Sequence, residues 1–431
     1  MRRYSTWCLL LFLLCCCLLL TSILSPRDSY QKIQVTESPR RDKSVHYFIP
    51  GRYDDIYMYS AIADDPKTLH AGSAVDVVVT ALDKTRVSLT CCMLLDGDNG
   101  TVFVTPASVY FHNYITLRSF THIASEYFHP STYLARQYRC TSQSRPRYVT
   151  LTSSACPDSI NDYLPVTYPK VSPRGLALCA KVARSPDLNV QKLAEWFEVQ
   201  RHLGVDKIVV YNLGVDNAIS AIFRYYKNLG LLEMLAYELP GEPRSRNLNE
   251  VFKRTRQFVQ DESVPVLDCK LRMSGYDFVL SHDLDEMVIP RENIPLKRLL
   301  KESLATSPNA AGFYLYTSFF LLDWTATNPK QKLIVKAYRT STVPRWEAIK
   351  FVFIPERTRT ILTHEIFPRP KYDTAILSPD DVILHHYRKC PRDTWGTCTA
   401  ATVVDDVMMR FRDLDSQVTQ VLERTLKIKQ F

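Results

Sequence analysis

The sequence is poor in glycine, which accounts for 12 of its 431 residues, or ~3% against a usual figure of ~7%. No pair of glycines falls in the G-x-G-x-x-G or G-x-x-x-x-G-K-[ST] pattern that places backbone amides around a phosphate. The H-E-x-x-H zinc motif, the G-x-S-x-G nucleophile turn and C-x-x-C cysteine pairs are absent as well. These absences exclude the common dinucleotide, P-loop, zinc-protease and serine-hydrolase sites.

Composition and charge narrow the class further. Hydrophobic residues make up 46% and charged residues 23% of the chain, so neither a disordered chain nor a polytopic membrane protein is expected. Lys and Arg outnumber Asp and Glu by 54 to 45, a net charge of +9, and the positive residues are scattered. A mildly basic, solvated surface is the simplest interpretation, although such a surface also attracts anionic ligands and membranes.

An uncharged, leucine-rich stretch occupies residues 7–24. About 20 such residues suffice to cross a bilayer, and Arg2 and Arg3 before the stretch predict that residues 1–6 form a cytoplasmic tail. A cleaved signal peptide is the main alternative and a buried core helix a weaker one, but the stretch is longer than a usual signal core and no A-x-A site follows it. We expect a signal anchor with the rest of the chain in the lumen.

Eight cysteines follow the predicted anchor, an even number that fits disulfides in an oxidising lumen. The local pairs Cys140–Cys156 and Cys390–Cys398 are the simplest pairings, although many other connectivities are open and some cysteines would be buried thiols in the alternative. Asn99 begins an N-G-T sequon in a turn-like segment and is predicted to be glycosylated.

The lumenal part divides into regions of different composition. Residues 25–45 are polar, with two Ser-Pro steps, and are predicted to be a stalk. Residues 46–170 contain short runs rich in Val, Thr, Tyr and Phe, the pattern of a small β-rich domain. Residues 171–390 form the next region, and residues 391–431 are a C-terminal extension with an amphipathic helix predicted over residues 399–429.

The region from residue 171 alternates apolar strands with amphipathic helices. Strands are expected at residues 176–182, 205–211, 231–239 and 276–281, and helices at residues 187–203, 216–229 and 247–271. Alternation of this kind predicts an α/β fold with βαβ units and a mostly parallel sheet. Ligands of such sheets bind beyond the carboxyl ends of the strands.

Three acidic residues follow the last of these strands. Asp283 and Asp285 are two residues apart, so in extended geometry their carboxylates project to the same side. Two carboxylates at a buried strand end favour a hard divalent cation, and Mg²⁺ or Mn²⁺ takes one or two carboxylates together with substrate phosphates. The segment therefore predicts a D-x-D metal site for a nucleotide diphosphate, with a solvated acidic turn as the alternative.

Several sequence blocks between residues 135 and 390 occur in an informative order. They are the strand with Cys179, LAEWFEVQRHLGVDKIVVYNLGVDN, RYYKNLGLLEMLAYELP, the Asp268–Cys269 pair, HDLDEMVIP, Lys350 and the H-Y-R segment that begins at His386. In these blocks the chain resembles glycosyltransferase family 92, although Leu284 stands at the D-x-D spacer where members commonly have Ile or Val. The resemblance implies a GT-A-type nucleotide-sugar-binding domain, a UDP-sugar donor and Mn²⁺ (or Mg²⁺). It also implies an inverting transfer, such as that of β1,4-linked galactose to the core fucose of N-glycans.

The resemblance also assigns roles to single residues. The metal ligands would be Asp283, Asp285 and His386, with His385 less favoured than His386 and His364 at another strand end. The residues expected to contact the donor are Asp283, Asp285, Glu286, Lys350 and Arg388. The two cations would neutralise the diphosphate as it departs, and Glu286 would orient a metal ligand. A packed histidine and a solvated lysine are the structural alternatives.

An inverting transfer needs a general base for the acceptor hydroxyl. The candidates are Asp323, Glu347 and Glu365, and the sequence does not choose among them. Trp324 and Trp346, beside two of these acids, are candidates for stacking on sugar rings or for packing in the core.

Two other classes compete with a glycosyltransferase. In a glycan hydrolase the acids would act as acid and base, but such pairs sit on separate elements about 5–9.5 Å apart. A non-catalytic, lectin-like glycan-binding protein on the same scaffold is the nearer alternative. The lumenal placement disfavours nucleic-acid binding, and the short anchor suits a thinner membrane such as that of the Golgi.

Overall fold

The computed structural model describes residues 29–32, 48–51, 55–64, 74–84, 87–95, 101–112, 133–185, 188–240, 256–390 and 398–426. The predicted anchor at residues 7–24 and the sequon at Asn99 lie outside these ranges. Of the helices within them, none has the length and apolar composition needed to cross a membrane.

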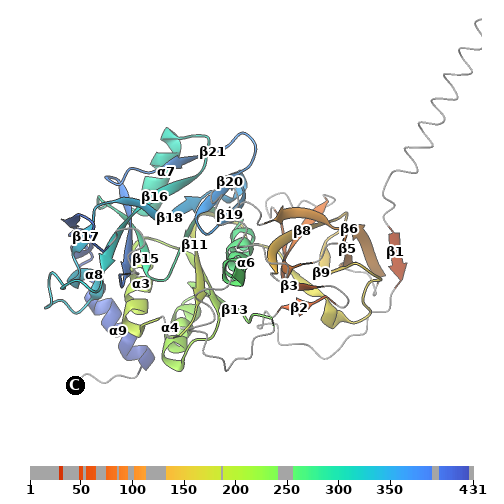
Figure 1. The fold of residues 1–431 in the computed structure, drawn as a ribbon, viewed down its shortest axis with the longest axis horizontal. Coiled ribbons are helices and arrows are strands. Elements are labelled where there is room, and N and C mark those ends of the chain that lie inside the picture. The colour runs from red at the N-terminus through yellow and green to blue at the C-terminus, as the bar shows by residue number, and fades with distance from the viewer. Residues whose placement is uncertain are drawn as a thin grey trace, which may run out of the picture.

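Two large sheets make up most of the described chain, and helix α6 (Arg256–Arg272) runs between them (Figure 1). The first sheet has ten strands in the order β1-β6-β5-β9-β10-β3-β4-β8-β7, with β2 on β3. Its pairs are antiparallel except for β10 with β3. The strands are β1 (Ser29–Lys32), β2 (Ile49–Pro50), β3 (Ile56–Ala63), β4 (Val75–Asp83), β5 (Thr90–Leu95), β6 (Thr101–Pro106), β7 (Ser108–His112), β8 (Leu134–Ser142), β9 (Pro146–Thr152) and β10 (Leu164–Thr167).

Strand β1 lies within the stretch that was expected to be a stalk. It pairs antiparallel with β6, since an extended segment satisfies the otherwise open edge of that strand. The domain boundaries assigned to the sequence stay predictions.

Four disulfides cross-link the described residues: Cys91–Cys140, Cys92–Cys156, Cys179–Cys269 and Cys390–Cys398. The predicted pair Cys390–Cys398 is confirmed, and the predicted pair Cys140–Cys156 is wrong. Cys91 and Cys92 are neighbours on β5, and adjacent side chains of a strand point to opposite faces. Each of them therefore reaches a different partner.

The second sheet has nine strands in the order β13-β12-β11-β14-β18-β16-β22-β15, with β21 on β16. The strands and helices that build it and cover it are β11 (Ser172–Ala183), α3 (Val190–His202), β12 (Lys207–Asn212), α4 (Asn217–Asn228), β13 (Leu232–Ala236), β14 (Tyr276–His282), β15 (Glu286–Pro290), α7 (Leu296–Thr306), β16 (Ala310–Leu321), α8 (Ile334–Ala337), β18 (Arg345–Phe353), β21 (Asp373–Ile376), β22 (Val382–Arg388) and α9 (Leu414–Leu426). Strands β11 to β14 form the parallel half that the strand–helix alternation predicts. Strand β18 then runs antiparallel to both its neighbours, so the sheet as a whole is mixed.

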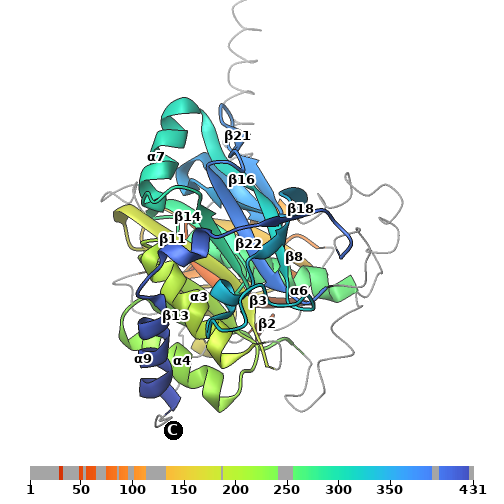
Figure 2. The same ribbon diagram turned by 90° about the vertical axis from the view of Figure 1, so that its left-hand side faces the viewer.

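Helices α3 and α4 cover one face of the second sheet with α9 packed against both of them, and α6 packs on the other face (Figures 1 and 2). The helix predicted over residues 399–429 is shorter than expected, because only α9 is α-helical there. Thr402–Val404 instead form strand β23, which pairs with β17 (Thr340–Thr342). Their side chains are β-branched, which favours a strand over a helix.

Helix α6 carries a buried ion pair at the junction of the sheets. The Asp268 carboxylate accepts hydrogen bonds from Arg272 Nε and Nη2 at 3.0 and 3.1 Å and from the Tyr211 hydroxyl at 2.5 Å. Tyr59, on β3 of the first sheet, donates to the backbone oxygen of Ala236 in the second. Polar side chains of both sheets are thus paired within the core around α6, which satisfies groups that would otherwise be costly to bury.

Replacing Arg272 by Met is expected to lower the free energy of unfolding by about 3–5 kcal/mol, because Asp268 would be left as a buried charge without its main partner. Urea unfolding followed by tryptophan fluorescence measures the change. Arg298→Met is the matched control, since Arg298 pairs with Glu302 on the exposed face of α7 and should leave stability unchanged. Equal effects of the two substitutions would contradict the structural role assigned to the buried pair.

Candidate functional site

The carboxyl ends of several strands meet at one edge of the second sheet. Strands β11 and β14 are parallel neighbours and end there together. Strand β18 runs antiparallel to β14, so its amino end lies at this edge, and β16 and β22 also end there. Side chains that are far apart in the sequence are therefore brought together where ligands of α/β sheets bind.

A cluster of two lysines and two acids occupies this edge. Lys350 Nζ lies 2.8 Å from Asp283 Oδ2 and 2.8 Å from Glu286 Oε1, and Lys181 Nζ lies 3.2 Å from Asp283 Oδ1. The Asp283 backbone amide donates to Glu286 Oε2 at 2.7 Å. Lys350 and Glu286 are buried, so neither charge would be tolerated without the other.

Electrostatics fix the charges of this cluster. Burial opposes ionisation of Asp283, but the charges of Lys181 and Lys350 and their hydrogen bonds outweigh it and hold the pKa of Asp283 well below its ordinary value. Burial likewise opposes the charge on Lys350, and Asp283 and Glu286 outweigh it, so the pKa of Lys350 is raised. Asp283 and Lys350 are therefore both charged at neutral pH.

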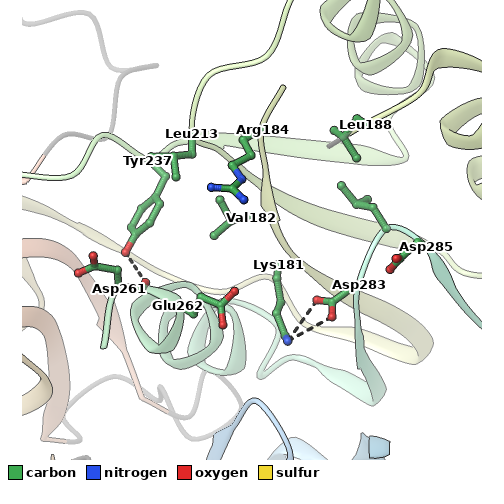
Figure 3. A pocket seen from close by; sticks show the side chains of 11 residues that line it. Lys181, Val182, Arg184, Leu188, Leu213, Tyr237, Asp261, Glu262, Asp283 and Asp285 are labelled. Atoms are coloured by element: carbon green, nitrogen blue, oxygen red, sulfur yellow. Dashed lines mark hydrogen bonds and ion pairs between the residues drawn. The ribbon is translucent and has the colours of Figure 1, made fainter. Parts of the chain in front are cut away.

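The two aspartates of the D-x-D segment do not project to the same side, as extended geometry would require. Strand β14 ends at His282, and residues 284 and 285 form a turn before β15. Asp283 points to Lys181, whereas Asp285 lies away from that lysine (Figure 3). The lysines of β11 and β18 hold Asp283 and leave Asp285 for a different partner.

That partner is His386 on β22. His386 Nε2 lies 3.3 Å from Asp285 Oδ2, and His386 Nδ1 lies 3.3 Å from Glu286 Oε1. Within the described part of the chain, ligand atoms of Asp285, Glu286 and His386 lie within 4.8 Å of one another and form a possible metal-binding group. The Glu286 carboxylate faces the second ring nitrogen of His386, as the outer partner of a metal-bound histidine usually does.

The spacing of Asp285 and His386 fits a shared cation. Two ligand atoms at about 2.1 Å from a metal and at right angles to each other are about 3 Å apart, close to the 3.3 Å observed. The Asp285 side chain is 45% exposed and His386 is buried, so a cation would have one solvent-facing side. Asp283, which is bound by two lysines, is the less suitable ligand of the two aspartates.

Two cavities adjoin the cluster. The first, of about 220 Å³, is lined by Lys181, Val182, Arg184, Leu188, Leu213, Tyr237, Asp261, Glu262, Asp283, Leu284 and Asp285 (Figure 3). The second, of about 240 Å³, is lined by Leu188, Asn189, Lys192, Leu193, Glu195, Leu284, Asp285, Met287, Ile334, Val335, Tyr387, Arg388 and Lys389. Leu188, Leu284 and Asp285 belong to both. Asp285 therefore lies at the junction of two spaces that together have the volume of a small-molecule site.

The other residues predicted to bind the donor, the metal or the acceptor proton have different surroundings. Arg388, at the end of β22, lines the second cavity. Asp323 accepts a hydrogen bond from the backbone amide of Cys390, and Glu347 forms an ion pair with Arg345. His385 faces Asp405 on the other side of β22 from His386. The carboxylates of Asp323 and Glu347 are therefore already paired with groups of the protein.

Glu365 and His364 stand at the turn between β19 (Thr358–Leu362) and β20 (Glu365–Pro368). Among the described residues, the Glu365 carboxylate has no hydrogen-bond or ion-pair partner, and burial raises its pKa. Nδ1 of His364 lies 2.7 Å from the backbone oxygen of Ile349. Loss of hydration, together with the charges of Lys350 and Lys181, lowers the pKa of His364 to about 4, so this ring is neutral at neutral pH.

Two residues of the site were missed from the sequence. Lys181 holds Asp283, and Glu262 on α6 faces the first cavity (Figure 3). Burial raises the pKa of Glu262, and its carboxylate has no hydrogen-bond partner among the described residues. A lysine inside the apolar run LALCAKV was the available signal for Lys181, because a buried strand rarely carries an unpaired charge.

Replacing Lys350 by Met is expected to lower the free energy of unfolding by about 3–5 kcal/mol, because Glu286 would become a buried charge without a cation. Urea unfolding measures this change. Lys181→Met is the matched control and should cost less, since Asp283 is 34% exposed and keeps Lys350 as a partner. A larger loss in the Lys181 variant would overturn the assignment of Lys350 as the central cation.

Comparison with known proteins identifies the family. The sequence profile of glycosyltransferase family 92 matches residues 174–426, whereas no curated protein matches the chain. Similar solved structures include residues 1–349 of TarS from S. aureus, with 11% identity over 58% of this chain and 70% of that chain and a TM-score of 0.22. UDP-glucose pyrophosphorylase from Acinetobacter baumanii has 9% identity over 58% of this chain and 92% of that chain, also with a TM-score of 0.22. TM-scores of this size identify neither a fold nor a function.

The profile match, by contrast, spans more than half of the 431 residues, and the chain therefore belongs to glycosyltransferase family 92.

Proposed function

We propose that the chain is a metal-dependent, inverting glycosyltransferase that transfers galactose from UDP-galactose to a glycan acceptor such as the core fucose of N-glycans. The observation that carries this proposal is the pairing of Asp285 with His386 at the junction of two cavities. Family membership supports the transferase class. The donor sugar, the acceptor and the GT-A type of the nucleotide-binding domain rest on the family resemblance.

The first cavity suits the nucleoside of the donor. Its apolar wall includes Val182, Leu213 and Tyr237, against which a base can pack, and Glu262 offers an acceptor for ribose hydroxyls or a base N–H. The second cavity brings Lys192, Arg388 and Lys389 to the same junction. These cations would attract the diphosphate and stabilise its charge as the leaving group forms.

Asp285 and His386 would hold Mn²⁺ or Mg²⁺, with Glu286 orienting the imidazole of His386. A cation held there supplies Lewis-acid stabilisation of the departing diphosphate. Lys350 pairs with both Glu286 and Asp283 and fixes the two carboxylates around this position. In this proposal Asp283 keeps its predicted role as a contact that orients the donor, but it is not a metal ligand.

Glu365 is the general base of this proposal. Of the three candidates, Asp323 and Glu347 are engaged in structural contacts. The raised pKa of Glu365 makes its carboxylate a stronger base, which favours proton transfer from a hydroxyl. The acceptor oxygen would lose its proton to Glu365 and form the bond to the anomeric carbon, while the bond from that carbon to the diphosphate oxygen breaks. No covalent enzyme intermediate forms in a single displacement of this kind.

The proposal includes a location. Residues 7–24 would anchor the protein in the Golgi membrane, with the catalytic domain in the lumen. An oxidising lumen would suit the four disulfides of the described residues.

The proposed function is tested with the purified full chain in detergent. Release of UDP is measured with a panel of nucleotide sugars, with and without N-glycan acceptors, before and after removal of divalent metal by a chelator. Turnover should occur with UDP-galactose, stop on metal removal and return with Mn²⁺. Asp285→Asn should abolish turnover and metal-dependent UDP binding, whereas Asp380→Asn, at an exposed turn, should change neither. No metal-dependent UDP binding by the wild-type chain would overturn the proposal in favour of a lectin-like protein.

Glu365→Gln tests the base. This variant should lose about 10²–10⁴-fold in kcat, the usual contribution of general base catalysis, and should bind UDP and Mn²⁺ as the wild type does. Glu347→Gln should lose much less. The assignment fails if the two variants lose kcat to the same extent.

A further inference from the structure

Trp346 is an exposed tryptophan at the edge of the catalytic domain. Its exposed fraction is 44%, whereas Trp196 is fully buried. The ring is held in place by two tyrosines of β16, since its centroid lies 5.0 Å from that of Tyr316 and 6.0 Å from that of Tyr314, both in edge-on geometry. A large apolar ring that is fixed and yet open to solvent is available for a ligand.

The local backbone explains why this ring faces outward. The pairing of β16 with β18 shifts register between Leu315 and Thr317. Ala348, two residues after Trp346, has a φ of +47°, a left-handed conformation that is rare outside glycine. Irregularities of this kind re-aim side chains and occur next to functional sites. The orientation of Trp346 is therefore maintained at a cost in local strain.

Trp346 lies on the same sheet edge as the catalytic cluster. Lys350 is four residues further along β18. The register shift shortens this part of the strand, because the five steps from Arg345 to Lys350 oppose only the two from Leu315 to Thr317, or about 7 Å along the sheet. The turn that carries Glu365 and His364 packs between them, because His364 contacts the backbone of Ile349 and the backbone amide of Ile366 donates to the Tyr314 hydroxyl at 2.9 Å. The proposed base is thus carried by a turn that contacts β18 between Trp346 and Lys350.

We propose that Trp346, supported by Tyr316, is the acceptor-binding platform, on which the apolar face of a pyranose ring of the glycan stacks. The inference rests on the proposed function and deepens it by assigning the acceptor side of the site. The apolar C–H face of a sugar matches an exposed aromatic ring, and the ion pair of Arg345 with Glu347 beside it provides donors and acceptors for the sugar hydroxyls. The turn that carries the proposed base contacts β18 between Trp346 and Lys350, so the stacked unit is assigned to a neighbour of the acceptor sugar rather than to the acceptor sugar itself.

Two substitutions test this platform. Trp346→Ala should raise the KM for a core-fucosylated N-glycan about 5- to 10-fold, the size expected for loss of one aromatic contact, and should leave the KM for UDP-galactose and its hydrolysis without acceptor unchanged. Trp346→Phe should recover most of the affinity. Methyl fucoside, which has no neighbouring sugar to stack, should show the same KM with all three proteins.

Tyr372→Ala is the matched control. Tyr372 is the other exposed aromatic among the described residues, and it lies under Arg357 away from the junction. Its loss should not change the KM for the N-glycan. An unchanged KM in Trp346→Ala, or an equal rise for methyl fucoside, would overturn the platform.

A direct binding measurement separates this inference from the proposed function. Titration of the core-fucosylated N-glycan into the full chain should perturb the tryptophan fluorescence of the wild type and not that of Trp346→Phe. If no donor is turned over and the glycan still perturbs Trp346, the transfer mechanism fails and the platform stands. If turnover occurs and the fluorescence of Trp346 does not respond to the glycan, the platform fails and the proposed function stands.

Discussion

The site depends on one buried cation. Lys350 joins Asp283, which follows β14, to Glu286, which begins β15, and it neutralises two carboxylates that would otherwise repel each other at a strand end. Glu286 in turn faces His386, and His386 faces Asp285. The geometry of the solvent-facing pair, Asp285 and His386, is thus set by a lysine that is only 2% exposed. The buried charge of Lys350, at one end of this series of contacts, fixes the orientation of Asp285 at the other end.

The sequence predicted the parts of the fold that depend on local periodicity. Strands β11, β12, β13 and β14 and helices α3 and α4 follow directly from the alternation of apolar and polar residues. The D-x-D segment was found at a strand end by the same reasoning. The position of β18 could not be predicted in this way. This strand lies antiparallel between β14 and β16 and so brings Lys350 to Asp283. Pairings between strands that are distant in the sequence leave no local pattern.

The same limit applies to the details of the site. The expectation that the carboxylates of Asp283 and Asp285 project to the same side assumed an extended strand, whereas residues 284 and 285 form a turn. Lys181 and Lys350 reach Asp283 from neighbouring strands and leave Asp285 to His386. The exposure of Trp346 likewise depends on a register shift and on the positive φ of Ala348, neither of which is encoded by a recognisable turn residue. Features that depend on contacts between segments distant in the sequence become visible only in the structure.

The disulfide between Cys179 and Cys269 has a consequence for ligand binding. Cys179 is two residues before Lys181 on β11, and Cys269 is seven residues, or two helical turns, after Glu262 on α6. Residues with these spacings share a face of a strand and of a helix. The covalent bond therefore sets the distance between two opposite walls of the first cavity, one from the sheet and one from the helix. Reduction of this one bond would free the two walls to move relative to each other, so the width of the cavity depends on the oxidation state of Cys179 and Cys269.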